Sequence, residues 1–244
     1  MLVLLLFVGL CPVLRAQGPA ITAYTEYHTR KEGVDTAGKK QPWQTVNLDA
    51  RPAGQSAMLG WRQWGRQEKN YTHYDGSETA SYGTGVNKVS DLLGYDTANT
   101  YVGTDSLFFV SYKDAKTGSA VKDNRTFVFG YNSLAFTVPA SAGPKILRLW
   151  TGAYACDGEL DADLVSPNGD VLASYSKTMA CPVLTADVGS NFFYGYWRIR
   201  FQGGGPSDTL RIRWQSQHRR EASANVLLQA AVLTPAALSP APLR

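Results

Sequence analysis

Alternation of apolar and polar residues is the feature that most constrains how this 244-residue chain can fold. In Trp197–Phe201 the apolar side chains take every second place, and two arginines take the places between them. The same period of two recurs in Leu210–Trp214, and in Leu160–Leu164 with acids as the polar residues. Successive side chains of a β-strand point to opposite faces. These segments therefore predict strands that have one buried face and one solvated face.

Helical periodicity is hard to find in the remaining sequence, which 23 glycines and 12 prolines interrupt often. Residues that favour strands fill the stretches between these breaks. Further strands are predicted at Ile21–His28, Thr45–Leu48, Met58–Trp64, Leu107–Tyr112, Thr126–Phe129, Ser133–Val138, Ile146–Trp150 and Val226–Leu233. Asn168-Gly169 predicts a hairpin turn, and the Gly-, Ser- and Thr-rich stretch Tyr71–Tyr101 is predicted as long loops. Many short strands at this spacing predict an all-β, antiparallel, jelly-roll-like β-sandwich in a single domain.

The two ends of the chain differ from the predicted domain in composition. Met1–Leu10 is almost wholly apolar, and a small residue, Ala16, closes the segment that follows. This pattern predicts a signal peptide over residues 1–16 and a secreted, extracellular product that starts at Gln17. The apolar run is too short to cross a bilayer, and no later run is longer, so no membrane span is expected. The Pro- and Ala-rich end, Thr234–Arg244, predicts a disordered tail, which leaves residues 17–233 for the sandwich.

Charge is nearly balanced, with 24 Lys and Arg against 20 Asp and Glu and a formal net charge of +4. The basic residues are dispersed, and the one dense spot, His218–Arg220, is followed at once by Glu221. A nucleic-acid interface needs a basic face interleaved with aromatic residues. The sequence has no such face, so nucleic acid is not an expected partner.

Two covalent features are expected of an exported chain. Cys11 leaves with the signal peptide, so Cys156 and Cys181 remain. An even count in an oxidising compartment predicts a disulfide, which closes a loop of about 25 residues and adds about 3 kcal/mol. A metal pair is the alternative, but no further ligand lies at the usual short spacing. The sequons at Asn70 and Asn124 predict N-glycosylation if the source is a eukaryote.

A series of blocks follows one another in a recognisable order. They are Thr45–Leu48, Gly60–Gly65, Phe136–Ala140, Leu147–Tyr154, Gly158–Leu164, Tyr194–Trp197, Thr209–Trp214 and Asn225–Ala231. Together they resemble an uncharacterised β-sandwich module of secreted bacterial multidomain proteins, often found beside glycoside hydrolases and immunoglobulin-like repeats. The resemblance covers Trp43 to Leu233. It implies a β-sandwich that works on extracellular polysaccharide, and it supplies no established activity.

The chain departs from this module at the tryptophan block. The module usually reads Asp-Trp-x-His-Trp-Gly there, whereas Gly60 and Gln63 take the acidic and histidine places in this sequence. Any chemistry or metal binding by that acid and histidine is therefore lost, which favours a packing role for Trp61 and Trp64. The two tryptophans are three residues apart and should not both point inward from one regular strand. We expect a bulge or one exposed ring.

Four acids at every second place form a ladder that projects from one face of a predicted strand. They are Asp157, Glu159, Asp161 and Asp163. Hard cations bind several oxygen ligands, so a calcium site at Asp157 and Asp161 is one interpretation. Neighbouring same-face positions are about 6.5–7 Å apart, however, too far for all four acids to share one ion. Outward stripes on other strands offer ion-pair partners and favour a solvated ion-pair face instead: Arg198, Arg200, Arg211 and Arg213.

Aromatic residues suggest what the chain binds. Sugars present flat apolar faces beside hydroxyl groups, so an exposed ring with a few polar groups suits glycan binding. Trp197 and Trp214 share their strand faces with apolar residues and should lie in the core. The predicted glycan-binding residues are Trp61 or Trp64 and Tyr74 or Tyr82, with Tyr95 and Tyr101 as further loop tyrosines. Nearby glycines would let the loop approach a ligand closely.

Catalytic motifs were sought and not found. The sequence has no Gly-x-Ser-x-Gly elbow, no His-Glu-x-x-His and no phosphate-binding glycine loop. We therefore expect a secreted, non-catalytic protein without a cofactor that binds or organises glycan, with extracellular polysaccharide or glycoprotein as its partner. The alternative is a structural or adhesive protein that contacts another protein. A glycan hydrolase that uses two opposed carboxylates is a third interpretation.

Overall fold

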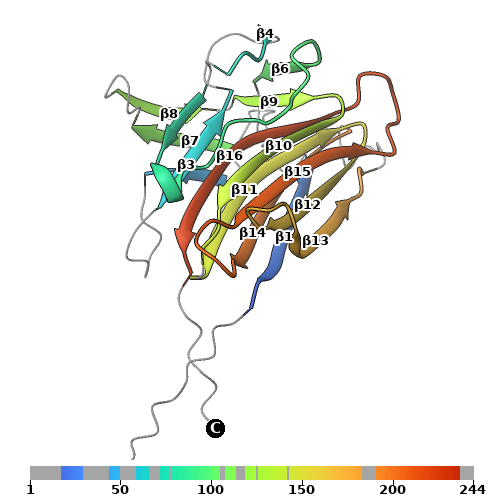
Figure 1. The fold of residues 1–244 in the computed structure, drawn as a ribbon. Coiled ribbons are helices and arrows are strands. Elements are labelled where there is room, and N and C mark those ends of the chain that lie inside the picture. The colour runs from blue at the N-terminus through green and yellow to red at the C-terminus, as the bar shows by residue number, and fades with distance from the viewer. Residues whose placement is uncertain are drawn as a thin grey trace, which may run out of the picture.

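Three β-sheets stacked in layers make up the computed structural model (Figure 1). It describes residues 18–29, 44–49, 59–65, 72–76, 79–104, 108–113, 119–124, 126–141, 143–182 and 191–236. Apart from one short 3₁₀ turn, η2 (Gly85–Asn87), the regular elements of these residues are strands. The predicted all-β sandwich is confirmed.

The middle layer, which we call the large sheet, has nine strands. Its main path runs β1 (Ala20–Thr29), β14 (Phe192–Gln202), β11 (Lys145–Tyr154), β16 (Asn225–Pro235), β9 (Phe127–Gly130), β6 (Thr100–Gly103) and β4 (Thr72–His73). Off this path, β3 (Gly60–Trp64) pairs with β16, and β5 (Thr79–Tyr82) pairs with β3. All of these pairs are antiparallel.

The two outer layers are smaller. The four-stranded sheet has the order β10 (Ser133–Pro139), β15 (Thr209–Gln217), β12 (Asp157–Val165) and β13 (Val171–Met179). The three-stranded sheet consists of β2 (Gln44–Asn47), β7 (Phe108–Lys113) and β8 (Ala120–Asn124). Its β2–β7 pair is parallel, which departs from the otherwise antiparallel architecture.

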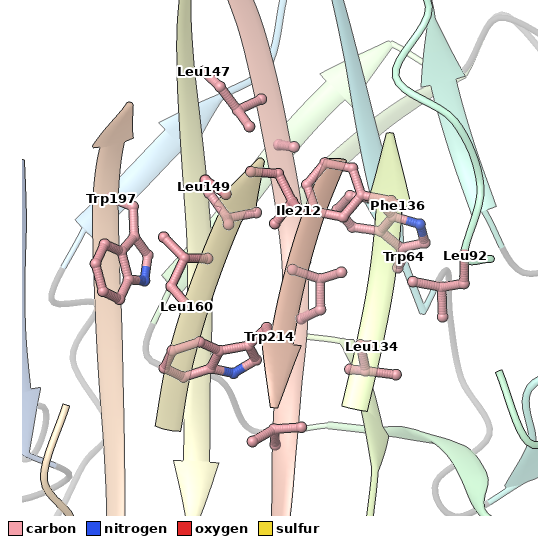
Figure 2. Packing of buried hydrophobic residues seen from close by; sticks show 14 of the residues in the cluster. Trp64, Leu92, Leu134, Phe136, Leu147, Leu149, Leu160, Trp197, Ile212 and Trp214 are labelled. Atoms are coloured by element: carbon pink, nitrogen blue, oxygen red, sulfur yellow. The ribbon is translucent and has the colours of Figure 1, made fainter. Parts of the chain in front are cut away.

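The main core lies between the large sheet and the four-stranded sheet (Figure 2). Trp197 and Trp214 are fully buried there, as predicted, with their ring centroids 5.9 Å apart. Trp197 Nε1 donates to Thr151 Oγ1 at 3.1 Å, and Trp214 Nε1 donates to the Gly152 carbonyl at 2.8 Å. The indole N–H groups of Trp197 and Trp214 are therefore both satisfied, which removes the cost of burying these two donors unpaired.

Gly158 on β12 is required by the ring of Trp214. A Cβ atom at this position would lie 2.2 Å from two atoms of the indole. Real Cβ atoms do not approach other heavy atoms so closely, so a side chain here would displace the ring. The alternation of β12 thus contains one position without a side chain, which makes room for the largest residue of β15.

A second apolar core lies between the large sheet and the three-stranded sheet. Trp61 of β3 contacts Tyr112 of β7, with ring centroids 5.0 Å apart. Gln229 Nε2 donates to the Phe108 carbonyl at 2.8 Å, next to an irregularity in the β11–β16 register. The middle of the large sheet is therefore covered on both faces.

The predicted hairpin between β12 and β13 is confirmed. Gly169 has a φ of +93°, which glycine adopts without strain, and the Ser166 N–H donates to the Asp170 carbonyl at 2.9 Å. Tyr71–Tyr101 holds more structure than predicted, because β4, β5, η2 and the start of β6 lie within it.

The predicted ends of the chain remain largely untested. β16 continues through Pro235, two residues into the segment predicted as a tail. The signal peptide and residues 237–244 lie outside the described residues. Among the residues that are described, no helix has the length and apolar character needed to cross a membrane.

Candidate functional site

The two tryptophans predicted as a sugar platform are both buried, with 1% of Trp61 and none of Trp64 exposed. Because they are three residues apart, they point to opposite faces of β3. Trp61 enters the core below the three-stranded sheet, and Trp64 packs against Phe136 of the four-stranded sheet, with centroids 4.8 Å apart (Figure 2). The expected bulge or exposed ring was wrong, because both faces of β3 are covered. Neither ring is available to a sugar.

Tyr74, another predicted glycan contact, is also buried, with 1% exposed. Its hydroxyl donates to Asp91 Oδ1 at 2.6 Å, and the other oxygen of Asp91 lies 3.3 Å from the guanidinium of Arg62. Burial raises the pKa of Tyr74 and lowers that of Arg62. Tyr74 therefore fixes a loop and does not bind ligand. Tyr82, the fourth candidate, is 53% exposed at the end of β5 and stays available.

The predicted disulfide is not formed. Cys156 and Cys181 are free thiols, and both are buried. Each sulfur lies 3.3 Å from a backbone carbonyl, that of Asn225 for Cys156 and that of Asn191 for Cys181. Burial raises the pKa of the Cys156 thiol to about 12, so this thiol is protonated at neutral pH.

The two sequons are not tested by the structure. Asn70 lies outside the described residues. Asn124 ends β8, and its side chain lies outside the described part as well. Glycosylation at both positions stays a prediction.

The acidic ladder lies on the outer face of the four-stranded sheet. Asp161 pairs with Arg213 and Asp163 with Arg211, each at 2.9 Å, and each arginine stands directly opposite its acid in the β12–β15 register. The predicted ion-pair face is confirmed for these two arginines. A depression of about 280 Å³ lies over them, lined by these four charged residues and Ala135.

The two weak calcium candidates have different partners. Asp161 holds Arg213, whereas Asp157 accepts a hydrogen bond from the Cys181 N–H at 2.7 Å and lies 2.9 Å from His218 Nδ1. Glu159, between them, accepts hydrogen bonds from glutamine side chains of β15. Within the described ranges, no group of three or more His, Cys, Asp or Glu is arranged to hold a metal ion.

A second set of arginines lies on the face of the large sheet that points away from the four-stranded sheet. We call this the outer face of the large sheet. The alternation of β14 buries Trp197, Ile199 and Phe201 and turns Arg198 and Arg200 outward. The expectation that these two arginines serve the acidic ladder was wrong. They belong to a different sheet, and the outer faces of the two sheets point away from each other, with the core between them.

The strand register places like charges side by side on this face. Arg148 of β11 stands directly opposite Arg198, and Tyr24 of β1 stands opposite Arg198 on its other side. Arg148 donates to Thr234 Oγ1 at 3.3 Å. In the part of the chain that the structure describes, neither Arg148 nor Arg198 forms an ion pair with a carboxylate. Like charges directly opposite each other destabilise a sheet.

Beside these arginines lies a hollow of about 290 Å³, which we call the Tyr24 hollow. It is lined by Thr22, Ala23, Tyr24, Ile146, Arg198 and Arg200. The Tyr24 side chain is 57% exposed, and its hydroxyl donates to Glu26 Oε1 at 2.9 Å. This hydrogen bond raises the pKa of Tyr24, so the ring stays neutral. Glu26 thereby orients an exposed aromatic ring at the edge of the hollow.

A third, smaller pocket of about 130 Å³ lies near Tyr131, between two turns. The Asp96 carboxylate in its wall already accepts hydrogen bonds from the Ala98 N–H at 2.9 Å and from the Asn99 amide at 2.6 Å. Its main polar group is therefore engaged within its own turn. Of the three surface features, the Tyr24 hollow is the one that combines an exposed ring with Arg198, which forms no ion pair with a carboxylate of the described residues.

Sequence reasoning missed the Tyr24 hollow for a definable reason. Tyr24 lies in a predicted strand, whereas the tyrosines predicted to bind glycan lie in predicted loops. The available signal was alternation, because Thr22, Tyr24 and Glu26 share one face of Ala20–Thr29. The neighbours of that face, β14 and β11, come from distant parts of the chain.

Comparison with known proteins finds no family and only weak structural likeness. No protein-family model matches the chain, and no curated protein matches it. Among solved structures, a carbohydrate-binding module, TmCBM61, in complex with β-1,4-galactotriose has 13% identity and a TM-score of 0.33. The match covers 61% of this chain and 88% of the module.

Two further solved structures show a similar level of likeness. One is the enzymatically active domain of bacteriophage CBA120 tailspike protein 4, with 12% identity, a TM-score of 0.34 and coverage of 60% of this chain and 19% of that one. The other is a glycoside hydrolase family 43 arabinoxylan arabinofuranohydrolase from Bacillus subtilis in complex with cellotetraose. It has 14% identity, a TM-score of 0.27 and coverage of 68% and 33%. Likeness this weak carries no argument about what the chain binds.

Proposed function

We propose that this chain is a secreted, non-catalytic glycan-binding protein and that it binds extracellular polysaccharide in the Tyr24 hollow. The observation that carries the proposal is the exposure of Tyr24. At 57% it is the most exposed large apolar side chain of the described residues. It stands at the edge of a hollow that also presents two guanidinium groups.

This combination matches the surface chemistry of a sugar. The C–H face of a pyranose ring packs against an aromatic ring, while its hydroxyl oxygens accept hydrogen bonds. Arg198 and Arg200 supply N–H donors in fixed planar forks, and the Thr22 hydroxyl both donates and accepts. These side chains stand on two paired strands, so little backbone conformational freedom is lost on binding.

The lining of the hollow supports binding without hydrolysis. Glycoside hydrolysis ordinarily needs two carboxyl groups that flank the scissile bond. None of the described residues that line the Tyr24 hollow is an acid. Glu26, two residues from Tyr24, accepts the tyrosine hydroxyl.

Contact with another protein, the alternative function, draws support from a different region. β13 is an edge strand of the four-stranded sheet, and Val171 and Leu172 on it are 54% and 38% exposed. Edge strands present unpaired backbone groups that can pair with another chain. Failure of glycan binding together with capture of a partner strand by β13 would favour this alternative.

The test is binding of the intact chain to a panel of soluble polysaccharides, measured by affinity electrophoresis and then by calorimetry. We expect dissociation constants from micromolar to millimolar, because a shallow stacking site excludes little water. Tyr24→Ala should weaken binding at least tenfold with an unchanged melting temperature. Tyr82→Ala is the matched control, since it removes a ring of similar exposure from a different strand. The proposal fails if no polysaccharide binds or if both variants weaken binding equally.

A further inference from the structure

We infer that the ligand of the Tyr24 hollow is an anionic polysaccharide whose acidic groups lie against Arg148 and Arg198. This inference rests on the proposed function and adds the chemical class of the ligand. It is carried by the row of Tyr24, Arg198 and Arg148 that the strand register creates on the outer face of the large sheet, in which neither arginine forms an ion pair with a described carboxylate.

The row consists of Tyr24, Arg198 and Arg148 on three adjacent strands. Directly opposite residues of antiparallel strands have Cβ atoms about 4.5–5.5 Å apart, so the two guanidinium groups share one small region. Neither has a carboxylate partner among the described residues. An anion between them would replace a repulsion with two charge-assisted hydrogen-bonding contacts.

Arginine suits this role better than a generic positive charge. Its guanidinium is planar and always protonated, and it offers forked N–H donors that match the oxygens of a carboxylate or a sulfate ester. The adjacent Tyr24 ring gives the sugar that carries the acidic group an apolar surface. The row thus offers recognition of both parts of an acidic sugar, the ring and its charge.

The nearest carboxylate on this face lies in the next row. Glu26 stands opposite Tyr196, two residues along β1 from Tyr24, and accepts the Tyr24 hydroxyl. Arg148 hydrogen-bonds the Tyr196 hydroxyl, which opposes the rise in the pKa of Tyr196 caused by burial. The acid therefore orients Tyr24 from the neighbouring row and leaves the Arg148–Arg198 pair without a counter-charge from the described residues.

The experiment compares polymers that differ only in charge. Polygalacturonate is tested against the same polymer after reduction of its carboxyl groups, and dextran sulfate against dextran. We expect the charged member of at least one pair to bind at least tenfold more tightly, with an affinity that falls as salt is raised. The pair that shows the difference tells whether the acidic group is a carboxylate or a sulfate.

Variants that each remove one arginine show which positive charges bind the anionic polymer. Arg198→Gln and Arg148→Gln should each abolish most of the preference for the charged polymer. Arg213→Gln removes the same charge from the opposite face, where the arginine is paired with Asp161, and should leave the preference unchanged. Equal loss in Arg213→Gln would mean that net charge alone attracts the polymer, and would overturn the inference.

The remaining outcomes separate the inference from the proposed function. If charged and neutral polymers bind equally well and both need Tyr24, the ligand is a neutral glycan and only the inference fails. If no polymer binds, the proposed function and the inference both fail. Inorganic sulfate provides a second readout, since it should raise the melting temperature of the wild-type chain and should not raise that of Arg198→Gln.

Discussion

The outer face of the four-stranded sheet and the face of the large sheet that points away from it both carry arginines on regular strands, but the neighbours of those arginines differ. On the four-stranded sheet, Arg211 and Arg213 stand opposite Asp163 and Asp161 and form ion pairs. On the large sheet, Arg198 stands opposite Arg148 and forms none with any described carboxylate. The arginines of the four-stranded sheet are thus paired with acids of the same sheet, whereas Arg198 and Arg148 of the large sheet can pair with a ligand.

The residue that stands opposite an arginine on the neighbouring strand therefore determines whether that arginine is already ion-paired or can bind a ligand. Exposed ion pairs contribute little to stability, about 0–1 kcal/mol. Their consequence for binding is larger, because a guanidinium held by a carboxylate has fewer donors left for a sugar.

The largest effect on stability should come from truncating a buried tryptophan in the core between the large sheet and the four-stranded sheet. Trp197→Ala should lower the free energy of unfolding by about 3–5 kcal/mol, because it leaves a large cavity and removes the hydrogen bond from the indole N–H to the Thr151 hydroxyl. Urea denaturation followed by tryptophan fluorescence and circular dichroism measures the change. Tyr24→Ala is the control and should leave unfolding nearly unchanged, because most of the Tyr24 ring is already in water. Equal losses would mean that Tyr24 is part of the packing and not a free surface.

A smaller loss should follow from Gly158→Ala. The added methyl group would meet the ring of Trp214, and overpacking of this kind costs about 1–3 kcal/mol. Thermal unfolding measures the effect, and Gly143→Ala is the control, because a Cβ there has only a contact at 4.0 Å. If Gly158→Ala left stability unchanged, the ring of Trp214 would have room to move, and the packing around it would be looser than the burial of these residues indicates.

Alternation made much of this fold predictable from sequence. It located β12, β14 and β15 and assigned Trp197 and Trp214 to the core, while the Asn168-Gly169 pair marked the hairpin turn. These features depend on a few neighbouring residues. β13 is absent from the predicted strands, because its exposed edge position weakens the usual alternation of apolar and polar residues.

The candidate site could not be predicted in the same way. The burial of Trp61 depends on the three-stranded sheet, which covers one face of β3, while Trp64 is buried on the other face. No pattern within β3 predicts that a third sheet covers it. The Arg148–Arg198 row depends on β11 and β14 being neighbours in one sheet. Sequence specified which face of each strand was polar, but the pairing of distant strands decided which charges would meet.

Removing one arginine from each face should change stability in different directions. Arg213→Gln leaves Asp161 without its ion-pair partner, so we expect a loss of about 0.2–1 kcal/mol. Arg198→Gln relieves a like-charge contact and should be neutral or stabilising by a similar amount. Urea denaturation at low and high salt measures both, and salt should shrink the difference. A clear destabilisation by Arg198→Gln would show that Arg198 has a partner in the fold and would break the comparison.

Lowering the pH should remove the stabilisation that the Asp163–Arg211 ion pair gives to the four-stranded sheet. Partial burial pushes the pKa of Asp163 upward, but hydrogen bonds from Arg211 and Ser174 outweigh it and hold the pKa below its ordinary value. A carboxyl with a depressed folded pKa stabilises the fold above its unfolded pKa of about 3.9, and this contribution is lost as pH falls through the folded value. Unfolding of the wild-type chain and of Asp163→Asn should therefore converge as pH falls below about 4. A difference between them that persists at low pH would exclude this charge as its origin.

Calcium should have the smallest effect, with almost no change in melting temperature at millimolar concentration. Along the acidic ladder, Asp161 is held by Arg213, and Asp157 by the Cys181 N–H and His218, so the two acids do not converge on one ion. A site filled at a hundredfold over its dissociation constant would stabilise the fold by about 2.7 kcal/mol, which thermal unfolding resolves easily. Magnesium at equal ionic strength is the control for general screening. A rise seen with calcium alone and abolished by Asp161→Asn would overturn the ion-pair interpretation, and the four-stranded face would then be a ligand site as well.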